Sequence, residues 1–183
     1  MLITGHVRDF DLQLHTQPGV FAARGIDDGT RLLIEAMEVA ADADVLDLGC
    51  GYGVIGIVAA KLAPQGHATL IDSDIRATRL AQKNVEINGV TNAEVVLGDA
   101  VHDLPAGARF DIVASNPPTH SGRGVLDDFV ASAHGVLQPG GQLYLVVNRL
   151  QSLRREVERV FGGAELAARS KGFVVIRAVK AED

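Results

Sequence analysis

Apolar residues occur along the chain in short runs that alternate between a strand pattern and a helix pattern. Residues 45–48 predict a buried strand, residues 49–53 a glycine-rich turn, and residues 54–63 a helix. The same order returns in a strand over residues 68–71 and a helix over residues 75–88. Strands that alternate with helices at this spacing indicate parallel strands joined by helical crossovers.

The second half of the chain continues this alternation. Further strands are predicted over residues 94–97, 110–115, 142–148, 165–168 and 172–178, and further helices over residues 125–137 and 150–161. The last two strands are close enough in sequence to form an antiparallel hairpin at the sheet edge. We therefore expect an α/β fold: a Rossmann-like, doubly wound, mostly parallel seven-stranded sheet with helices on both faces and an antiparallel C-terminal edge hairpin.

The N-terminal region has a weaker pattern. Residues 1–26 alternate apolar and polar positions up to a Pro-Gly turn, and this pattern fits either a hairpin or a flap. A helix is predicted to follow, with an apolar face from Leu32 to Ala40 and with Asp28 or Thr30 as its N-cap.

Length and composition favour a single domain over residues 1–183, with a flap and helix in residues 1–40 and the Rossmann-like core in residues 41–183. The chain is 47% hydrophobic and only 4% aromatic, which suggests an aliphatic interior between helices and sheet. Cys50 is the only cysteine, and no segment resembles a secretory signal or a bilayer span. We expect a cytoplasmic protein with no membrane partner.

The net charge of −6 argues against indiscriminate binding to polyanions. Basic residues nevertheless outnumber acidic ones in residues 149–183. Four arginines fall on or beside one predicted helix there: Arg149, Arg154, Arg155 and Arg159. They form either a solvated face paired with Glu156 and Glu158 or a docking surface for RNA.

The glycine turn carries the first chemical signal. Residues 51–56 fit the spacing G-x-G-x-x-G, and Asp72 follows about 20 residues later, as in dinucleotide-binding folds. Glycine allows positive φ and brings bare backbone N–H groups close to a ligand at a helix N-terminus. An acid at the end of the second strand accepts hydrogen bonds from the ribose of any nucleoside, so the turn and Asp72 alone leave the cofactor open.

Polar residues also follow the next two core strands. Asp99 comes directly after the third strand, and Asn116 and Pro117 follow the fourth. Because the carboxyl ends of parallel strands meet at one edge of the sheet, these residues are expected beside the glycine turn and Asp72. An acid at this position can hold an adenine amino group, while an Asn-Pro-Pro segment offers fixed oxygen acceptors for another amine.

This set of motifs resembles the class I S-adenosylmethionine-dependent methyltransferases of the small methyltransferase domain family. The similar segments are Asp47-Leu48-Gly49-Cys50-Gly51-Tyr52-Gly53, Asp72, Gly98-Asp99-Ala100 and Asn116-Pro117-Pro118. Residues 16–21, 27–33 and 116–122 further resemble the members that methylate guanine N2 of small-subunit ribosomal RNA. The resemblance extends from about residue 10 to residue 180.

The resemblance implies S-adenosyl-L-methionine as the cofactor and an exocyclic amine, above all guanine N2 of ribosomal RNA, as the acceptor. It assigns cofactor binding to Asp47, Gly49, Gly51, Gly53, Asp72, Ser73, Asp99 and Ala100. The catalytic contacts to the amine would come from the Asn116 side chain and the Pro117 carbonyl. Substrate binding would involve Phe21, Pro118, Thr119 and His120.

Several alternatives remain at the level of the sequence. Thr119 stands where many amino methyltransferases carry an aromatic residue that can stack on a flipped base. Threonine cannot stack in this way, so a DNA-adenine substrate is less favoured, and Phe21 or another side chain would have to stack on the base. The alternative methyl acceptor is a protein glutamine. The chain could also be a non-catalytic cofactor-binding subunit, and the least favoured alternative is an NAD-type oxidoreductase. No histidine or cysteine spacing predicts a metal site, and we expect a monomer or homodimer with RNA as substrate.

Overall fold

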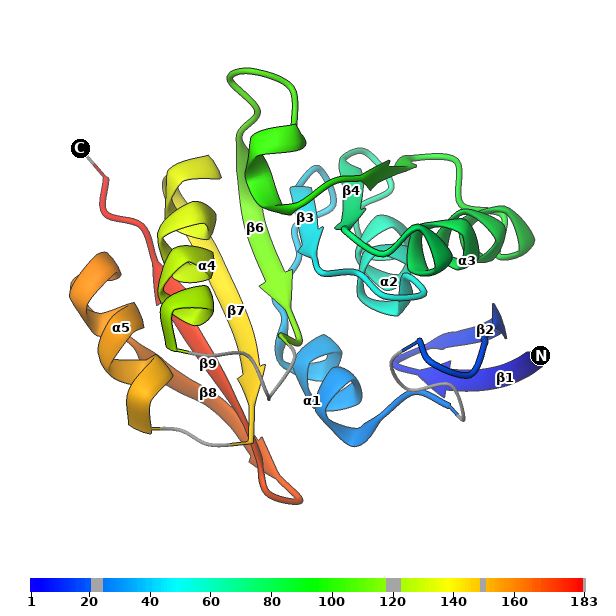
Figure 1. Cartoon of the computed structure of the whole chain (residues 1–183), viewed down its shortest axis with the longest axis horizontal. Coiled ribbons are helices and arrows are strands. Elements are labelled where there is room, and N and C mark those ends of the chain that lie inside the picture. The colour runs from blue at the N-terminus through cyan, green and yellow to red at the C-terminus, as the bar shows by residue number, and fades with distance from the viewer. Residues whose placement is uncertain (21–24, 118–122, 149–150, 183) are drawn as a thin grey trace.

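A sheet with strand order β5-β4-β3-β6-β7-β9-β8 forms the centre of the computed structural model, which describes residues 1–20, 25–117, 123–148 and 151–182 (Figure 1). Its strands are β3 (Asp44–Leu48), β4 (His67–Asp72), β5 (Ala93–Leu97), β6 (Phe110–Ser115), β7 (Leu137–Val147), β8 (Glu165–Ser170) and β9 (Phe173–Val179). Strands β5, β4, β3, β6 and β7 are mutually parallel, and β9 and β8 complete the sheet in antiparallel pairings. The predicted fold class is confirmed.

Helices cover both faces of this sheet (Figure 1). They are α1 (Asp28–Ala36), α2 (Val54–Leu62), α3 (Ile75–Ile87), α4 (Arg123–Val136) and α5 (Gln151–Phe161), with a short 3-10 helix η1 (Ala100–Asp103) after β5. One apolar core lies under α1, α2 and α3, and a second lies under α4 and α5. Successive side chains of a strand point to opposite faces, so Val45 enters the first core and Leu46 the second.

The N-terminal residues form an antiparallel hairpin of β1 (Leu2–Val7) and β2 (Phe10–His15), which is a separate two-stranded sheet. Asn84 and Asn88 of α3 attach this hairpin to the core. Asn84 accepts from the His15 N–H at 2.6 Å and donates to the His15 carbonyl at 3.0 Å, and Asn88 makes the same pair with Gln13. Of the two forms that the sequence left open, the structure has the hairpin.

Helix α1 differs from its prediction at both ends. Asp27, rather than Asp28 or Thr30, is the N-cap, and the helix ends at Ala36 instead of continuing to Ala40. Arg8, in the turn between β1 and β2, donates from its guanidinium to carbonyl groups in the last turn of α1. The apolar spacing could not reveal where α1 ends, because the Arg8 side chain that caps its C-terminal end comes from a distant segment.

Strand β7 begins earlier than predicted. The sequence suggested a helix through Leu137 and a break over residues 138–141, but Leu137 already pairs with Phe110 in the sheet. The Pro-Gly-Gly segment is an irregularity within the strand, where Gly140 and Gly141 exchange backbone hydrogen bonds with Lys180. A bulge of this kind accommodates proline and glycine without ending the pairing.

Candidate functional site

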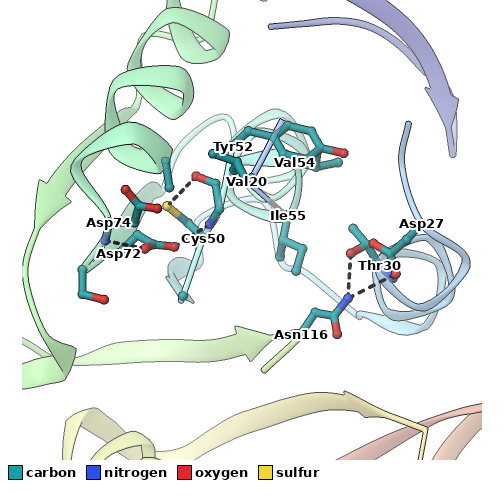
Figure 2. A pocket seen from close by; sticks show the side chains of 15 residues that line it. Val20, Asp27, Thr30, Cys50, Tyr52, Val54, Ile55, Asp72, Asp74 and Asn116 are labelled. Carbon is teal, nitrogen blue, oxygen red and sulfur yellow. Dashed lines mark hydrogen bonds between the residues drawn. The ribbon is translucent and has the colours of Figure 1, made fainter. Parts of the chain in front are cut away.

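A cavity of about 300 Å³ opens at the carboxyl ends of the parallel strands. Its walls come from the turn after β3, the residues that follow β4, Asn116 after β6, and two segments before and at the start of α1 (Figure 2). The lining is more apolar than polar, with Val20, Val54 and Ile55 beside a few polar side chains. This combination is typical of a small-molecule site.

The glycine turn exposes backbone to the cavity. Gly49 and Gly51 have φ of +73° and +56°, which L side chains rarely adopt. Apart from the adjacent residues of the chain, no atom of the described residues lies within 4 Å of where a Cβ would stand at either glycine. The Gly49 and Cys50 N–H groups both donate to the Ile71 carbonyl at 2.9 Å, which fixes the turn against the end of β4. The turn thus leaves open space for a ligand beside bare backbone.

Gly53 and Gly56 do not line the cavity but allow α2 to pack closely on the sheet. A Cβ at Gly56 would lie 2.3 Å from Leu70 Cγ, and one at Gly53 would lie 3.0 Å from a Leu70 methyl carbon. Gly53 therefore contributes to the helix–sheet contact, and its cofactor-binding role remains a prediction. Close helix–strand packing is one of the roles that glycine has in such turns.

Asp47 lies beneath the turn, fully buried. Its Oδ2 accepts from the Gly56 N–H at 2.8 Å, so the carboxyl group ties β3 to the first turn of α2. Burial raises the pKa of Asp47 to about 7, opposed by the Gly56 hydrogen bond and reinforced by the charge of Asp72. Its place below the cavity fits the expected role in ordering the turn.

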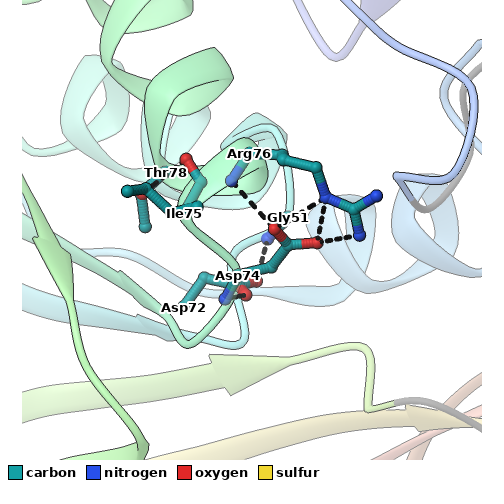
Figure 3. Close-up of polar contacts among 6 residues, drawn as sticks. All are labelled: Gly51, Asp72, Asp74, Ile75, Arg76 and Thr78. Carbon is teal, nitrogen blue, oxygen red and sulfur yellow. Dashed lines mark hydrogen bonds and ion pairs between the residues drawn. The ribbon is translucent and has the colours of Figure 1, made fainter.

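Asp72 stands at the rim of the cavity, at the end of β4. Its Oδ2 accepts from the Gly51 N–H and its Oδ1 from the Asp74 N–H, both at 2.8 Å (Figure 3). Each carboxylate oxygen retains acceptor capacity for a ribose hydroxyl. The neighbouring Ser73 also lines the cavity.

Asp74 is a further polar group in the cavity lining, and no sequence motif pointed to it. It caps α3 by accepting from the Arg76 N–H at 2.8 Å, and it forms a 2.6 Å ion pair with the Arg76 guanidinium (Figure 3). The hydrogen bonds from Arg76 lower the pKa of Asp74 to about 2. Its negative charge therefore lies at the cavity wall already paired.

Asp99 and Ala100 follow β5, next to the strand that carries Asp72. Asp99 is exposed and lies outside the cavity lining, and its N–H donates to Asp103 Oδ2 at 2.7 Å. The predicted adenine contacts of these two residues thus concern the surface beyond the cavity, and they remain a prediction.

Asn116 is brought to the opposite wall from Asp72 by the β3–β6 pairing. The preceding Ser115 is fully buried and donates from its hydroxyl to the Leu48 carbonyl at 2.6 Å, which joins the ends of the two strands. Asn116 is half-buried and the following Pro117 is buried. Phe21, Pro118, Thr119 and His120, which were predicted to bind substrate, lie outside the described residues.

The residues that hold Asn116 were missed at the level of the sequence. Its Nδ2 lies 3.2 Å from Asp27 Oδ1 and 3.0 Å from Thr30 Oγ1 (Figure 2). Asp27 and Thr30 also line the cavity. Residues 27–33 start a predicted helix and belong to the segments that resemble the guanine-N2 methyltransferases, but nothing local in them indicates a contact with a residue 89 positions away.

Two other side chains of the turn are packed. Cys50 is buried at the cavity wall, where burial raises the pKa of its thiol well above the usual range. The Tyr52 hydroxyl donates to the Gly25 carbonyl at 3.0 Å, and burial raises the pKa of this phenol too. Neither is prepared to act as a nucleophile, since the reactive thiolate or phenolate is disfavoured.

The arginines of α5 are largely engaged with acids on the same helix. Arg154 pairs with Glu158 at 2.8 Å, and Arg159 pairs with Glu156. These contacts match the solvated-face interpretation for both arginines. Arg155 is exposed, and no ion pair of its side chain occurs among the described residues.

Two negative observations apply to the part of the chain that the structure describes. No three His, Cys, Asp or Glu side chains gather there in a way that could hold a metal ion. No helix among those residues is both long and apolar enough to cross a bilayer.

The comparison with known families assigns this site to a class. The family model described as "Methyltransferase small domain" matches residues 11–177. The chain belongs to the small methyltransferase domain family. Because methyltransferases of this family use S-adenosylmethionine, the predicted family, enzyme class and cofactor are confirmed at the level of the family.

Individual relatives of the small methyltransferase domain carry ribosomal RNA names. The Streptomyces avermitilis "Ribosomal RNA large subunit methyltransferase G" is 36% identical over 88% of this chain and 44% of its own length. The Hamiltonella defensa "Ribosomal RNA small subunit methyltransferase C" is 34% identical over 92% of this chain and 50% of its own length.

A solved structure resembles the whole described fold. The 16S rRNA N2 methyltransferase RsmC of T. thermophilus, in complex with AdoMet and guanosine, superposes with a TM-score of 0.90 and 29% identity. The alignment covers 98% of this chain and 50% of the RsmC chain. This small methyltransferase domain thus spans about half the length of each of these three relatives.

Proposed function

We propose that this chain transfers the methyl group of S-adenosylmethionine to an exocyclic amino group of a ribosomal RNA base, and that guanine N2 is the acceptor. The observation that carries the proposal is the place of Asn116. Its side chain lines the same cavity as the glycine turn and Asp72, on the opposite wall. A cofactor on the turn and an amine at Asn116 would therefore face each other.

The residues of the cavity suit the proposed cofactor. The open space above Gly49 and Gly51 would take the methionine and ribose parts, which need backbone close by and no Cβ. Asp72 would accept hydrogen bonds from the ribose hydroxyls. S-adenosylmethionine, when bound, supplies the electrophilic methyl group on its sulfonium centre.

Asn116 and Pro117 would handle the acceptor. An amine conjugated to a base is a poor nucleophile, because its lone pair is delocalised into the ring. The Asn116 Oδ1 and the Pro117 carbonyl oxygen would accept hydrogen bonds from the two N–H groups of the substrate amine. These bonds would concentrate electron density on the amine nitrogen. Fixing the nitrogen in line with the methyl group would supply much of the rate, and the extra proton can leave after transfer.

The choice of ribosomal RNA and guanine N2 is supported by the relatives. Their names refer to ribosomal RNA of the large or the small subunit, and the RsmC structure holds guanosine. Because this chain covers about half the length of each of these three proteins, its own RNA, its target nucleotide and its ability to act without further segments are parts of the proposal.

The proposal is tested by tritium-methyl transfer to unmodified 16S and 23S transcripts and to undermethylated ribosomal subunits. The wild type should label one of these, and digestion should yield N2-methylguanosine. Asn116→Ala should lower the rate at least about 100-fold while S-adenosylhomocysteine still binds in calorimetry. Labelling of a release-factor glutamine but of no RNA would favour a protein substrate. Binding of NAD but not of S-adenosylhomocysteine would favour an oxidoreductase. Equal transfer rates for Asn116→Ala and the wild type would exclude the proposed mechanism.

A further inference from the structure

The amide nitrogen of Asn116 donates to two acceptors on the segment that starts α1. One acceptor is Asp27 Oδ1 at 3.2 Å and the other is Thr30 Oγ1 at 3.0 Å (Figure 2). A carboxylate oxygen can only accept, so the nitrogen and not the oxygen of the amide must face α1. The Asn116 Oδ1 is left as the unused polar atom of this side chain within the part of the chain that the structure describes.

The group that holds the amide is itself fixed. Asp27 Oδ1 also accepts from the Gly29 and Thr30 N–H groups, both at 3.0 Å, and this makes Asp27 the N-cap of α1. Thr30 is buried in the first turn of the helix. A Cβ at Gly29 would lie 2.9 Å from the Phe173 ring, so this turn is packed tightly against β9. The helix start thus provides a rigid frame for the Asn116 side chain.

We infer that Asp27 and Thr30 are positioning residues for the acceptor amine: they hold the Asn116 amide in the one orientation that presents Oδ1 to it. This inference rests on the proposed function, because it assumes that Asn116 accepts a hydrogen bond from the substrate. An amide turned by 180° would present N–H groups to the N–H groups of the amine. In that orientation the N–H groups of Asn116 would face the N–H groups of the substrate amine without an acceptor between them, which would weaken substrate binding.

Asp27 contributes its charge as well as its geometry. Donation from Nδ2 to a carboxylate is a charge-assisted hydrogen bond, and it polarises the amide so that more negative charge resides on Oδ1. A more negative Oδ1 is a stronger acceptor for an amine that gains positive charge as it is methylated. The arrangement stabilises the transition state more than the bound substrate, so its loss should lower kcat rather than raise KM.

Three substitutions separate these contributions. Thr30→Val removes one acceptor and keeps the shape, whereas Thr30→Ser keeps the hydroxyl. Asp27→Asn removes the charge but retains a side-chain oxygen that caps helices about as well. Thr78→Val is a matched control, because Thr78 is 7% exposed like Thr30, lies in the first turn of α3 and donates to the Ile75 carbonyl at 3.2 Å, outside the cavity lining.

The first readout is the methyl-transfer rate on the RNA that the wild type labels. Thr30→Val and Asp27→Asn should each lower kcat about tenfold, with KM for RNA and the Kd for S-adenosylhomocysteine within about twofold of wild type. Thr30→Ser and Thr78→Val should remain close to wild type. Unchanged kcat in both Thr30→Val and Asp27→Asn would overturn the inference, as would a loss that Thr30→Ser or Thr78→Val shares.

The second readout needs no activity. In two-dimensional 15N NMR the Asn116 side-chain amide, assigned by comparison with Asn116→Ala, should show protons that exchange slowly in the wild type and faster in Thr30→Val and Asp27→Asn. Exchange that is indifferent to both substitutions would overturn the inference. If the wild type labels a glutamine in place of RNA, the proposed RNA substrate fails while the same series on that acceptor, with the same ranking of variants, supports the positioning role.

Discussion

Asp47 Oδ2 accepts from the Gly56 N–H at 2.8 Å, while Asp47 Oδ1, fully buried, finds no hydrogen-bond partner among the described residues. The carboxyl group thus fixes the start of α2 under the cofactor turn at the expense of one unsatisfied oxygen. A buried oxygen without a donor disfavours the charged form, which explains the raised pKa of this group.

Stability should therefore depend on pH through Asp47. Its pKa in the folded protein, about 7, lies above the unfolded value of 3.8, so its contribution is fully present below about pH 4 and is lost as the pH rises through 7. Urea unfolding of wild type and Asp47→Asn between pH 4 and pH 8 checks this. We expect the free energy of unfolding of the wild type, relative to the variant, to fall by about 1 kcal/mol per pH unit from about pH 4 to pH 7 and to level off above pH 7.

Asparagine at position 47 can still accept from the Gly56 N–H, and its amide does not titrate. The substitution therefore changes the free energy of unfolding by an amount that does not itself depend on pH. The contributions of the other ionisable groups cancel in the difference between wild type and variant. A difference that is flat from pH 4 to pH 8 would contradict the assignment to Asp47.

Gly56→Ala should destabilise the protein. The new Cβ would stand 2.3 Å from Leu70 Cγ, so α2 would have to move away from β4. Overpacking of this kind costs about 1–3 kcal/mol. Gly135→Ala is the matched control, since Gly135 lies on α4, no described atom beyond its own helix backbone lies within 4 Å of its Cβ position, and alanine favours a helix over glycine. In thermal unfolding, the midpoint temperature should be lower than wild type for Gly56→Ala and equal or higher for Gly135→Ala. The reverse order would show that Gly56 is not required for packing.

Asn84→Ala should loosen the N-terminal hairpin. Asn84 is fully buried and bonds both backbone groups of His15 and the Tyr52 carbonyl, all of which would lose a partner. We expect a loss of about 3 kcal/mol and faster hydrogen exchange at the His15 amide.

The corresponding variant at Asn88, which bonds Gln13 at a partly exposed site, serves as the comparison. Water can replace the lost bonds there, so the effect should be about 1 kcal/mol or less. Equal losses at the two positions would indicate that burial does not decide the strength of these bonds.

Arg155 provides the test of an RNA-docking face on α5. Arg154 is already paired with Glu158, whereas Arg155 is exposed. If phosphates dock there, Arg155→Gln should weaken ribosomal RNA binding in filter assays and reduce the salt slope by about 1, and Arg154→Gln should have less effect. Cofactor-product binding should be unchanged in both. Identical RNA affinity for both variants and wild type would restrict α5 to a solvated face.

Much of the core was predictable because its signals are local. The strand, glycine turn and helix over residues 45–63 follow from an apolar run, a cluster of residues that permit positive φ, and a helical periodicity. Parallel strands then place Asp72 and Asn116 at one edge of the sheet without any knowledge of side-chain contacts. The boundaries that failed are those fixed by distant segments: Arg8 contacts the end of α1, and Phe110 pairs with Leu137 at the start of β7.

The sequence by itself determined the order of strands and helices, through periodicity and turn chemistry, and it placed the glycine turn, Asp72 and Asn116 at one edge of the sheet, where the motifs pointed to a methyl donor and an amine acceptor. Only the tertiary structure decided how two of these groups act. Gly53 packs so closely that an added Cβ would lie 3.0 Å from Leu70, and the Asn116 amide is held by Asp27 and Thr30. The physical reason is that a hydrogen bond or a close packing contact depends on distance in space, and residues 89 positions apart carry no local sign of it.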